Sequence, residues 1–215
     1  MRIIQIAGFL GSGKTTLLLR LSRSLAEEKG FKVALVVNEI GEIPVDGKVM
    51  EESGMKVKDI GGGCICCEVA STFAKTLTQL YRDFSPDVVL VEPTGVALPR
   101  QVKLAAAMGS RGAPIEIGPV VVLFDATRPA ELLDMELMGR LVTSQLADAD
   151  IVAVSKVDVV DAAALEAAMV AVKEVIPGAE FIPVSSVTGE GFDVLIERLS
   201  ADPASEPDRE VVGAD

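Results

Sequence analysis

The residues with the clearest chemical potential form a glycine-rich run close to the N-terminus. The run Gly8-Phe9-Leu10-Gly11-Ser12-Gly13-Lys14-Thr15-Thr16 fully matches the pattern G-x-x-x-x-G-K-[ST]. The glycines let the backbone curl until successive N–H groups point at phosphate oxygens, and a helix that starts here adds its positive end. Lys14 should reach the β- and γ-phosphates, and the Thr15 hydroxyl should bind Mg²⁺. The run predicts a phosphate site made by Gly8, Gly11, Ser12, Gly13, Lys14, Thr15 and Thr16.

A second motif, Ser155-Lys156-Val157-Asp158, indicates the base of the nucleotide. P-loop GTPases usually carry Asn-Lys-x-Asp here. A carboxylate at Asp158 accepts hydrogen bonds from N1–H and the exocyclic amine of guanine, and adenine has neither donor. The Lys156 stem would cover the base. Ser155 stands in place of the usual Asn and is expected to hold the base-binding segment less tightly. The alternative is that Asp158 only caps a helix.

The run Ser185-Ser186-Val187-Thr188-Gly189-Glu190-Gly191 follows 27 residues after Asp158. It resembles the loop whose backbone meets the guanine carbonyl in many GTPases. Ser185 is therefore predicted to belong to the same site, with GTP and GDP as the ligands.

A carboxylate at a strand end supplies the candidate catalytic group. The stretch Glu92-Pro93-Thr94-Gly95 follows an apolar segment, so Glu92 would hold Mg²⁺ or position a water, and the Gly95 N–H would approach the γ-phosphate. The predicted catalytic residues are Lys14, Glu92 and Gly95. The alternative is that Glu92 is an exposed acid before a turn.

All three cysteines of the chain lie within Gly61-Gly62-Gly63-Cys64-Ile65-Cys66-Cys67-Glu68. Thiolates this close together, before a helix, suit Zn²⁺, and Co²⁺, Ni²⁺ or Fe²⁺ less selectively, with a carboxylate or water completing the shell. Two other interpretations stay open. The C-x-x-C of Cys64 and Cys67 could be a redox pair, or the cysteines could be small buried hydrophobic residues.

Composition narrows the remaining classes of function. The 215 residues include 20 Lys and Arg against 32 Asp and Glu, and no His, for a formal charge of −12. Such an acidic surface disfavours nucleic acid and anionic membranes as partners. The lack of His excludes Ser-His-Asp triads, histidine-ligated zinc and imidazole bases. Neither a membrane span nor a signal-peptide pattern is present, so a cytoplasmic protein is expected.

Apolar segments alternate with helical patterns along the whole chain. Strands are predicted at residues 3–7, 32–37, 88–91, 120–124, 151–154 and 181–184, and helices at 14–28, 70–84, 99–108, 131–146, 162–175 and 192–199. This order predicts an α/β fold of the P-loop NTPase type, a doubly wound, mostly parallel sheet with helices on both faces. Long loops are expected at 38–59 and 109–118. Residues 1–200 are expected to form one domain, and 201–215 an acidic, flexible tail.

Four stretches of the sequence together resemble the CobW-like GTPases, which are related to the UreG and HypB nickel-insertion GTPases of the SIMIBI class. They are the P-loop run, Asn38-Glu39-Ile40-Gly41-Glu42, Gly63-Cys64-Ile65-Cys66-Cys67 and Glu92-Pro93-Thr94-Gly95-Val96-Ala97-Leu98-Pro99, with Ser155-Lys156-Val157-Asp158 matching except at its first position.

The resemblance implies a GTP-hydrolysing metallochaperone or insertase whose cysteines, Cys64, Cys66 and Cys67, carry the transferred metal. It places Glu42 near that metal and Asp46 near Mg²⁺. It also implies delivery to a client metalloprotein or a corrinoid-pathway protein, and a nucleotide-dependent homodimer. Intrinsic turnover should be slow because no arginine finger is evident in the sequence.

Longer family members often carry a His-rich segment and a separate C-terminal domain; this sequence contains no His, and we expect the chain to consist of the GTPase domain without that second domain. Client recognition is therefore expected to use the GTPase surface or a separate subunit. Three alternatives stay open: a GTPase that activates or reactivates a corrinoid enzyme, a metal buffer regulated by nucleotide, and a small-molecule kinase, in which the guanine motif and the cysteines would have no role.

Overall fold

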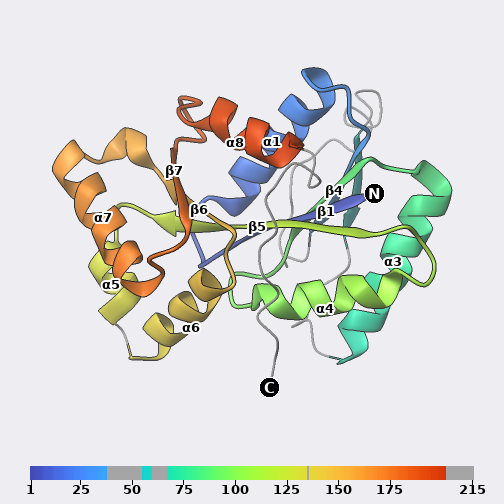
Figure 1. The fold of residues 1–215 in the computed structure, drawn as a ribbon, viewed down its shortest axis with the longest axis horizontal. Coiled ribbons are helices and arrows are strands. Elements are labelled where there is room, and N and C mark those ends of the chain that lie inside the picture. The colour runs from blue at the N-terminus through green and yellow to red at the C-terminus, as the bar shows by residue number, and fades with distance from the viewer. Residues whose placement is uncertain (38–54, 60–66, 135, 202–215) are drawn as a thin grey trace.

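The computed structural model describes residues 1–37, 55–59, 67–134 and 136–201 (Figure 1). The strands are β1 (Arg2–Gly8), β2 (Val33–Val37), β3 (Met55–Asp59), β4 (Val88–Glu92), β5 (Glu116–Asp125), β6 (Ile151–Ser155) and β7 (Glu180–Val184). The helices are α1 (Lys14–Glu27), α3 (Cys67–Phe84), α4 (Pro99–Gly109), α5 (Pro129–Asp134), α6 (Glu136–Ala147), α7 (Ala162–Val175) and α8 (Phe192–Ser200), with one 3₁₀ turn, η1 (Val157–Val159).

The seven described strands form one sheet in the order β3-β2-β4-β1-β5-β6-β7. Each neighbouring pair is parallel. The strands β2, β4 and β6 are buried at every position, as their uninterrupted apolar sequences require. The predicted doubly wound α/β fold is confirmed, and its described sheet is parallel throughout.

Helices cover both faces of the sheet. In Figure 1, α1 and α8 lie above the sheet, while α4 and α6 lie below it. Leu17, Leu21 and Leu195 pack with the strands in one core cluster, and helices α3 and α4 belong to a cluster on the opposite face that contains Phe73 and Val102. Burying a side chain of this size stabilises the fold by about 1.5–3 kcal/mol, so the two core layers fix the strand order.

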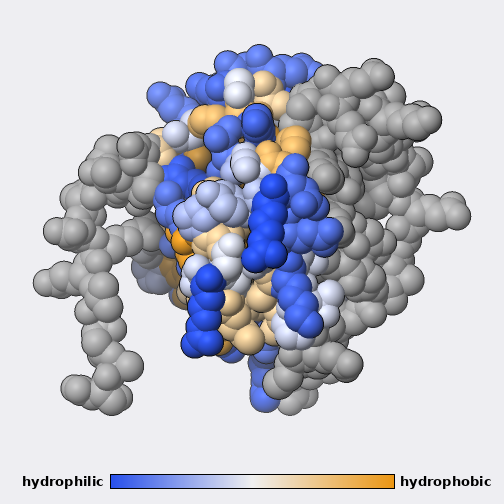
Figure 2. Space-filling view, turned by 90° about the vertical axis from the view of Figure 1, so that its right-hand side faces the viewer, coloured by the Kyte–Doolittle hydropathy of each residue, from blue (hydrophilic) through white to orange (hydrophobic). Residues whose placement is uncertain are grey.

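Helices α3 and α4 are amphipathic, and Figure 2 shows their outer side. There the described surface mixes hydrophilic and hydrophobic side chains. Leu77 and Leu80 of α3 are buried against the sheet, whereas Leu104 and Met108 of α4 are exposed. One face of each helix therefore suffices to anchor it.

Because neighbouring strands are parallel, the carboxyl ends of β1, β4, β5, β6 and β7 lie at the same edge of the sheet. Strand β1 lies between β4 and β5, so the chain leaves it toward one half of the sheet and later returns to build the other half. Open α/β sheets bind ligands outside the carboxyl ends of their strands at this kind of switch point. The glycine-rich run follows β1, so the fold places it there.

The elements differ from the sequence predictions in two places. Residues 55–59 were expected in a loop but form the outermost described strand, β3. Their alternation of apolar and polar residues is typical of a strand with one covered face. Residues 131–146 were expected to form one helix but lie in two, α5 and α6, and Gly139 of α6 packs so closely on α5 that an added Cβ would overlap the Leu133 carbonyl.

Among the described helices, none has the length and apolar character needed to cross a bilayer. The division of the chain into one domain and a tail from residue 201 stays a prediction. Of the proposed tail, the described part includes Ala201 alone, which accepts a hydrogen bond from the Arg2 guanidinium through its carbonyl oxygen.

Gly8, the last residue of β1, lies very close to the backbone of β5 and provides a test of the fold. It has φ of +137°, and a Cβ added there would lie 2.6 Å from the Leu123 carbonyl oxygen. We expect Gly8→Ala to lower the free energy of unfolding by about 1–3 kcal/mol, because both the φ angle and the contact become strained. Urea unfolding in the absence of nucleotide measures this change in the free energy of unfolding. Gly178→Ala is the control, since nothing lies within 4 Å of its added Cβ; equal losses in the two variants would contradict the explanation.

Candidate nucleotide-binding site

The phosphate-binding loop joins β1 to α1. Gly8, Gly11 and Gly13 have φ angles of +137°, +76° and +93°, which side chains other than glycine rarely adopt. Gly13 directly precedes α1, so the N–H groups of the first helical turn face the loop. The predicted arrangement of strand, glycine loop and helix is present.

Lys14 and Ser12 point into this loop. Lys14 has only 4% of its surface exposed, and its Nζ donates a hydrogen bond to the Phe9 carbonyl oxygen at 3.3 Å. The Ser12 hydroxyl is buried and has no hydrogen-bond partner within the described ranges. A buried hydroxyl without a partner is costly, so its position in a phosphate-binding motif indicates a polar ligand.

Thr15 and Glu92 meet beneath the loop. The Thr15 Oγ1 donates a hydrogen bond to Glu92 Oε1 at 2.8 Å, and Glu92 has no exposed surface. Glu92 ends β4, which pairs directly with β1. The interpretation of Glu92 as an exposed acid is therefore wrong. A hydroxyl and a carboxylate are oxygen ligands of the type that Mg²⁺ prefers, so the pair fits that ion.

The loop after Glu92 packs on the phosphate-binding loop. A Cβ on Gly95 would lie 2.7 Å from Leu10 Cδ2 and 3.0 Å from the Leu10 nitrogen, so only glycine fits this approach. On the other side, Gln145 of α6 donates from Nε2 to the carbonyl oxygens of Gly95 and Ala97 at 3.1 and 2.9 Å. Sequence reasoning missed Gln145, since an isolated glutamine in a helix carries no signal.

Ser155 connects the base motif to the phosphate loop. Its Oγ lies 2.9 Å from the Ser12 carbonyl oxygen and 3.3 Å from the Phe124 carbonyl oxygen, as a donor to both. Ser155 thus contacts the phosphate loop directly, and the expectation that it holds the base-binding segment less tightly than Asn would stays a prediction. Lys156 follows with φ of +64°, and Asp158 is exposed in η1.

Asp125, at the end of β5, holds Lys156. The Lys156 Nζ lies 2.8 Å from Asp125 Oδ2, and Thr127 donates to Oδ1 from its backbone N–H and its hydroxyl at 3.0 and 2.7 Å. Burial raises the pKa of Asp125, but the hydrogen bonds from Lys156 and Thr127 outweigh burial, and the net pKa lies below its ordinary value. Sequence reasoning missed Asp125, although an acid ending an apolar strand was the same signal that singled out Glu92.

The loop from Ser185 is fixed by its own turn and by α1. Ser185 is fully buried, and its Oγ accepts hydrogen bonds from the Val187 and Thr188 N–H groups at 3.2 and 3.0 Å. Arg20 of α1 donates to the Ser186 and Val187 carbonyl oxygens at 3.0 and 3.2 Å. The helix that starts at the phosphate loop therefore also positions the predicted base loop. Sequence reasoning missed Arg20.

The residues predicted to bind the transition metal, and Asp46, which was predicted near Mg²⁺, fall where the structure gives no side-chain description. Cys64, Cys66, Glu42 and Asp46 lie outside the described residues. Cys67 is the first residue of α3, but its side chain is not described. The cysteine metal site therefore stays a prediction.

The fold and this arrangement define a P-loop nucleotide-binding domain. Residues 2–183 match the family CobW/HypB/UreG, nucleotide-binding domain, and the chain belongs to that family. The resemblance inferred from the sequence is confirmed.

Similar proteins agree with this assignment. The chain is 31% identical over 188 residues to the zinc chaperone CobW of Sinorhizobium sp, covering 75% of this chain and 52% of that protein. It is 36% identical over 154 residues to the zinc chaperone YeiR of Escherichia coli K12, covering 71% and 45%. The chain thus spans about half the length of these curated relatives. The crystal structure of the hydrogenase maturation factor HypB from Archaeoglobus fulgidus has the same fold, with a TM-score of 0.67, 22% identity, and 92% and 87% coverage.

Asp125→Asn tests how much the buried Asp125 carboxylate stabilises the site. We expect the free energy of unfolding at pH 7 to fall by about 1.5–3 kcal/mol, the usual contribution of hydrogen bonds to a charged group. Because the folded pKa lies below the ordinary 3.8, the carboxylate stabilises the protein above pH 3.8, and this contribution disappears as pH falls through the folded pKa. The difference between wild type and variant should therefore shrink in acid.

Urea unfolding at pH 7, 5 and 3.5 measures this difference, with Glu197→Gln as the exposed-acid control. A difference that stays constant across these pH values would show that the Asp125 charge is not responsible.

Proposed function

We propose that this domain binds and hydrolyses GTP and uses the nucleotide state to control a metal held by Cys64, Cys66 and Cys67, which it delivers to a client protein. The observation that carries the proposal is the register of three neighbouring strands. Asp59 of β3 pairs with Val37 of β2, and Val37 pairs with Glu92 of β4. Strand β3 therefore ends at the level of Glu92, about two strand spacings or ~10 Å away, and Cys64 follows five residues later in the sequence.

Guanine is the base that the site suits best. Lys156 is held by Asp125 and Ser155 is tied to the phosphate loop, so the Ser-Lys-x-Asp backbone is anchored at two points. The exposed Asp158 carboxylate is then available to accept hydrogen bonds from the N1–H and amine of guanine. The fixed loop from Ser185 offers backbone groups to the same base.

The residues below the phosphate loop have the chemistry that GTP hydrolysis requires. Lys14 supplies a positive charge for the phosphates, and Thr15 and Glu92 supply oxygen ligands. Bound there, Mg²⁺ would compensate phosphate charge. Gly95, packed on Leu10, would bring its N–H to the γ-phosphate, so the loop that begins at Glu92 would respond to hydrolysis.

Zinc is the metal that we propose as cargo. Closely spaced thiolates with a carboxylate such as Glu42 are a ligand set typical of Zn²⁺, and they also accept Co²⁺, Ni²⁺ or Fe²⁺. Two relatives bear the name zinc chaperone, which supports zinc first. Asp46 is proposed to assist at Mg²⁺, and a second copy of the chain or a client metalloprotein is the proposed partner.

Asp158→Asn tests the base assignment. The amide can accept from N1–H but cannot accept from the guanine amine, whereas it can donate to the C2 carbonyl of xanthine. We expect GTP affinity to fall about 10- to 100-fold and xanthosine triphosphate affinity to rise, measured by competition against a fluorescent nucleotide.

The control is Asp161→Asn, three residues away, where the side chain caps α7 by accepting from the Ala164 N–H. Its nucleotide preference should not change. Equal affinity of the wild type for GTP and ATP would refute the role of Asp158.

Anaerobic titration of Zn²⁺ into the protein with GTP, with GDP and without nucleotide tests the coupling. We expect zinc affinity to differ by about 5-fold or more between the GTP and GDP states, the usual size of such coupling. Cys66→Ser should weaken zinc binding and leave GTP affinity unchanged. The same zinc affinity in all three nucleotide states would refute the proposed chaperone mechanism. A protein that binds zinc but does not hydrolyse GTP would favour the metal-buffer alternative.

A further inference from the structure

Arg128 lies beside the phosphate-binding loop, in the connection between β5 and α5. Its NH2 group lies 3.3 Å from the Leu10 carbonyl oxygen and 3.4 Å from Asp125 Oδ2. A Cβ added to Gly11 would lie 3.6 Å from the same nitrogen. The guanidinium group is therefore in contact with the middle of the loop whose N–H groups face the phosphates.

The cluster around Asp125 carries one more positive charge than negative. The carboxylate is shared by Lys156 at 2.8 Å and Arg128 at 3.4 Å. Because the shorter contact belongs to Lys156, the charge of Arg128 is the less compensated of the two. A surplus cation next to this loop stands out in a chain whose formal charge is −12.

Arg128 is also weakly held. Both of its contacts are longer than the 2.7–2.9 Å typical of charge-assisted hydrogen bonds, and its side chain is 39% exposed. Solvent screens a guanidinium of that exposure, so its ion pair with Asp125 is weak. The guanidinium can exchange these contacts for phosphate oxygens at little cost, while Lys156 keeps Asp125 paired.

We propose that Arg128 is an additional cation of the nucleotide site, which turns from Asp125 to the terminal phosphates of GTP and stabilises the charge that develops during hydrolysis. The inference rests on the proposed GTP hydrolysis. In that step the oxygen of water forms a bond to the γ-phosphorus and the bond to the β–γ bridging oxygen breaks. One proton of the water stays on the phosphate product, the other passes to solvent, and GDP and phosphate leave. Arg128 transfers no proton; it donates hydrogen bonds, and Asp125 holds it between turnovers.

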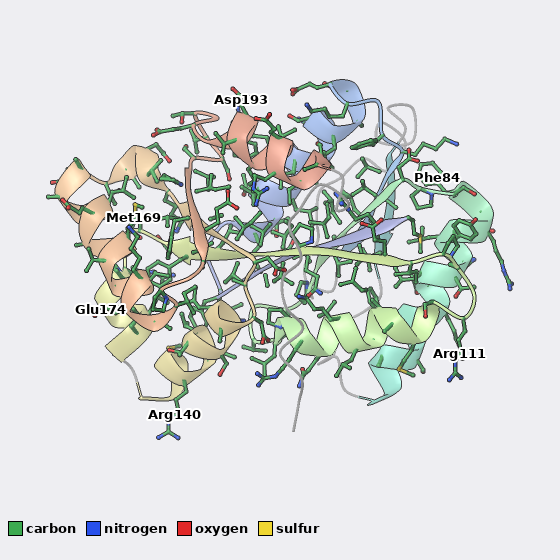
Figure 3. All side chains as sticks on the ribbon, in the orientation of Figure 1. Phe84, Arg111, Arg140, Met169, Glu174 and Asp193 are labelled. Carbon is green, nitrogen blue, oxygen red and sulfur yellow. The ribbon has the colours of Figure 1, made fainter. Side chains whose placement is uncertain are left out.

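The experiment compares Arg128→Ala and Arg128→Lys with Arg111→Ala. Arg111 follows α4 and projects outward at the opposite end of that helix from the site, so its removal is the control for lost charge (Figure 3). Three quantities are measured in each protein: the single-turnover rate of GTP hydrolysis, the affinity for GDP, and the affinity for GDP with aluminium fluoride, which mimics the transferring phosphoryl group.

We expect Arg128→Ala to slow hydrolysis by about 100- to 1,000-fold, as loss of one donor to a transition state does. It should also weaken the aluminium fluoride complex by a similar factor, with GDP affinity changed less than about threefold, since GDP has no γ-phosphate. Arg128→Lys should recover part of the rate, because it keeps the charge but not the planar fork. Arg111→Ala should match the wild type.

Two results would overturn the inference alone, with the wild type hydrolysing GTP normally. One is a wild-type rate in Arg128→Ala. The other is an equal loss of affinity for GDP and for the aluminium fluoride complex, even if hydrolysis is slower, which would make Arg128 a structural residue. A wild-type protein that hydrolyses no GTP would instead overturn the proposed function, and the inference with it.

Discussion

Two carboxylates without exposed surface, Glu92 and Asp125, end the strands on either side of β1, and the need to pair them organises the site. A buried charge is costly unless it is hydrogen-bonded. Thr15 from the phosphate loop helps satisfy Glu92, while Lys156 from the base motif satisfies Asp125. Each acid therefore ties a ligand-binding segment to the centre of the sheet.

Side-chain bonds to backbone carbonyls connect the remaining loops. Ser155 joins the base motif to Ser12, and Arg20 joins the first helix to the loop from Ser185. Gln145 holds the loop at Gly95 against Leu10. The phosphate loop is thus in contact with segments at three other strand ends, those of β4, β5 and β6.

The features predicted from the sequence are those that depend on residues close together in the chain. The glycines, Lys14 and Thr15 form a continuous motif, and the apolar segments indicate a parallel sheet, so the sheet and the strand, loop and helix around the motif were predicted correctly. Arg20, Arg128 and Gln145 were missed because they contact residues far away in the chain, whereas Asp125 could have been singled out as an acid that ends an apolar strand. The outer strand β3 was missed because strand pairing is a tertiary contact.

By itself the sequence determined the class of fold, the phosphate motif and the family, because local backbone geometry and hydrophobic periodicity are encoded in neighbouring residues. Only the tertiary structure decided that Glu92 is buried against Thr15 and that Ser155 can brace the loop. It also decided that Arg128 stands beside Leu10, 118 residues earlier in the chain. The physical reason is that a parallel sheet brings distant strand ends together, and burial there gives each polar group its partner.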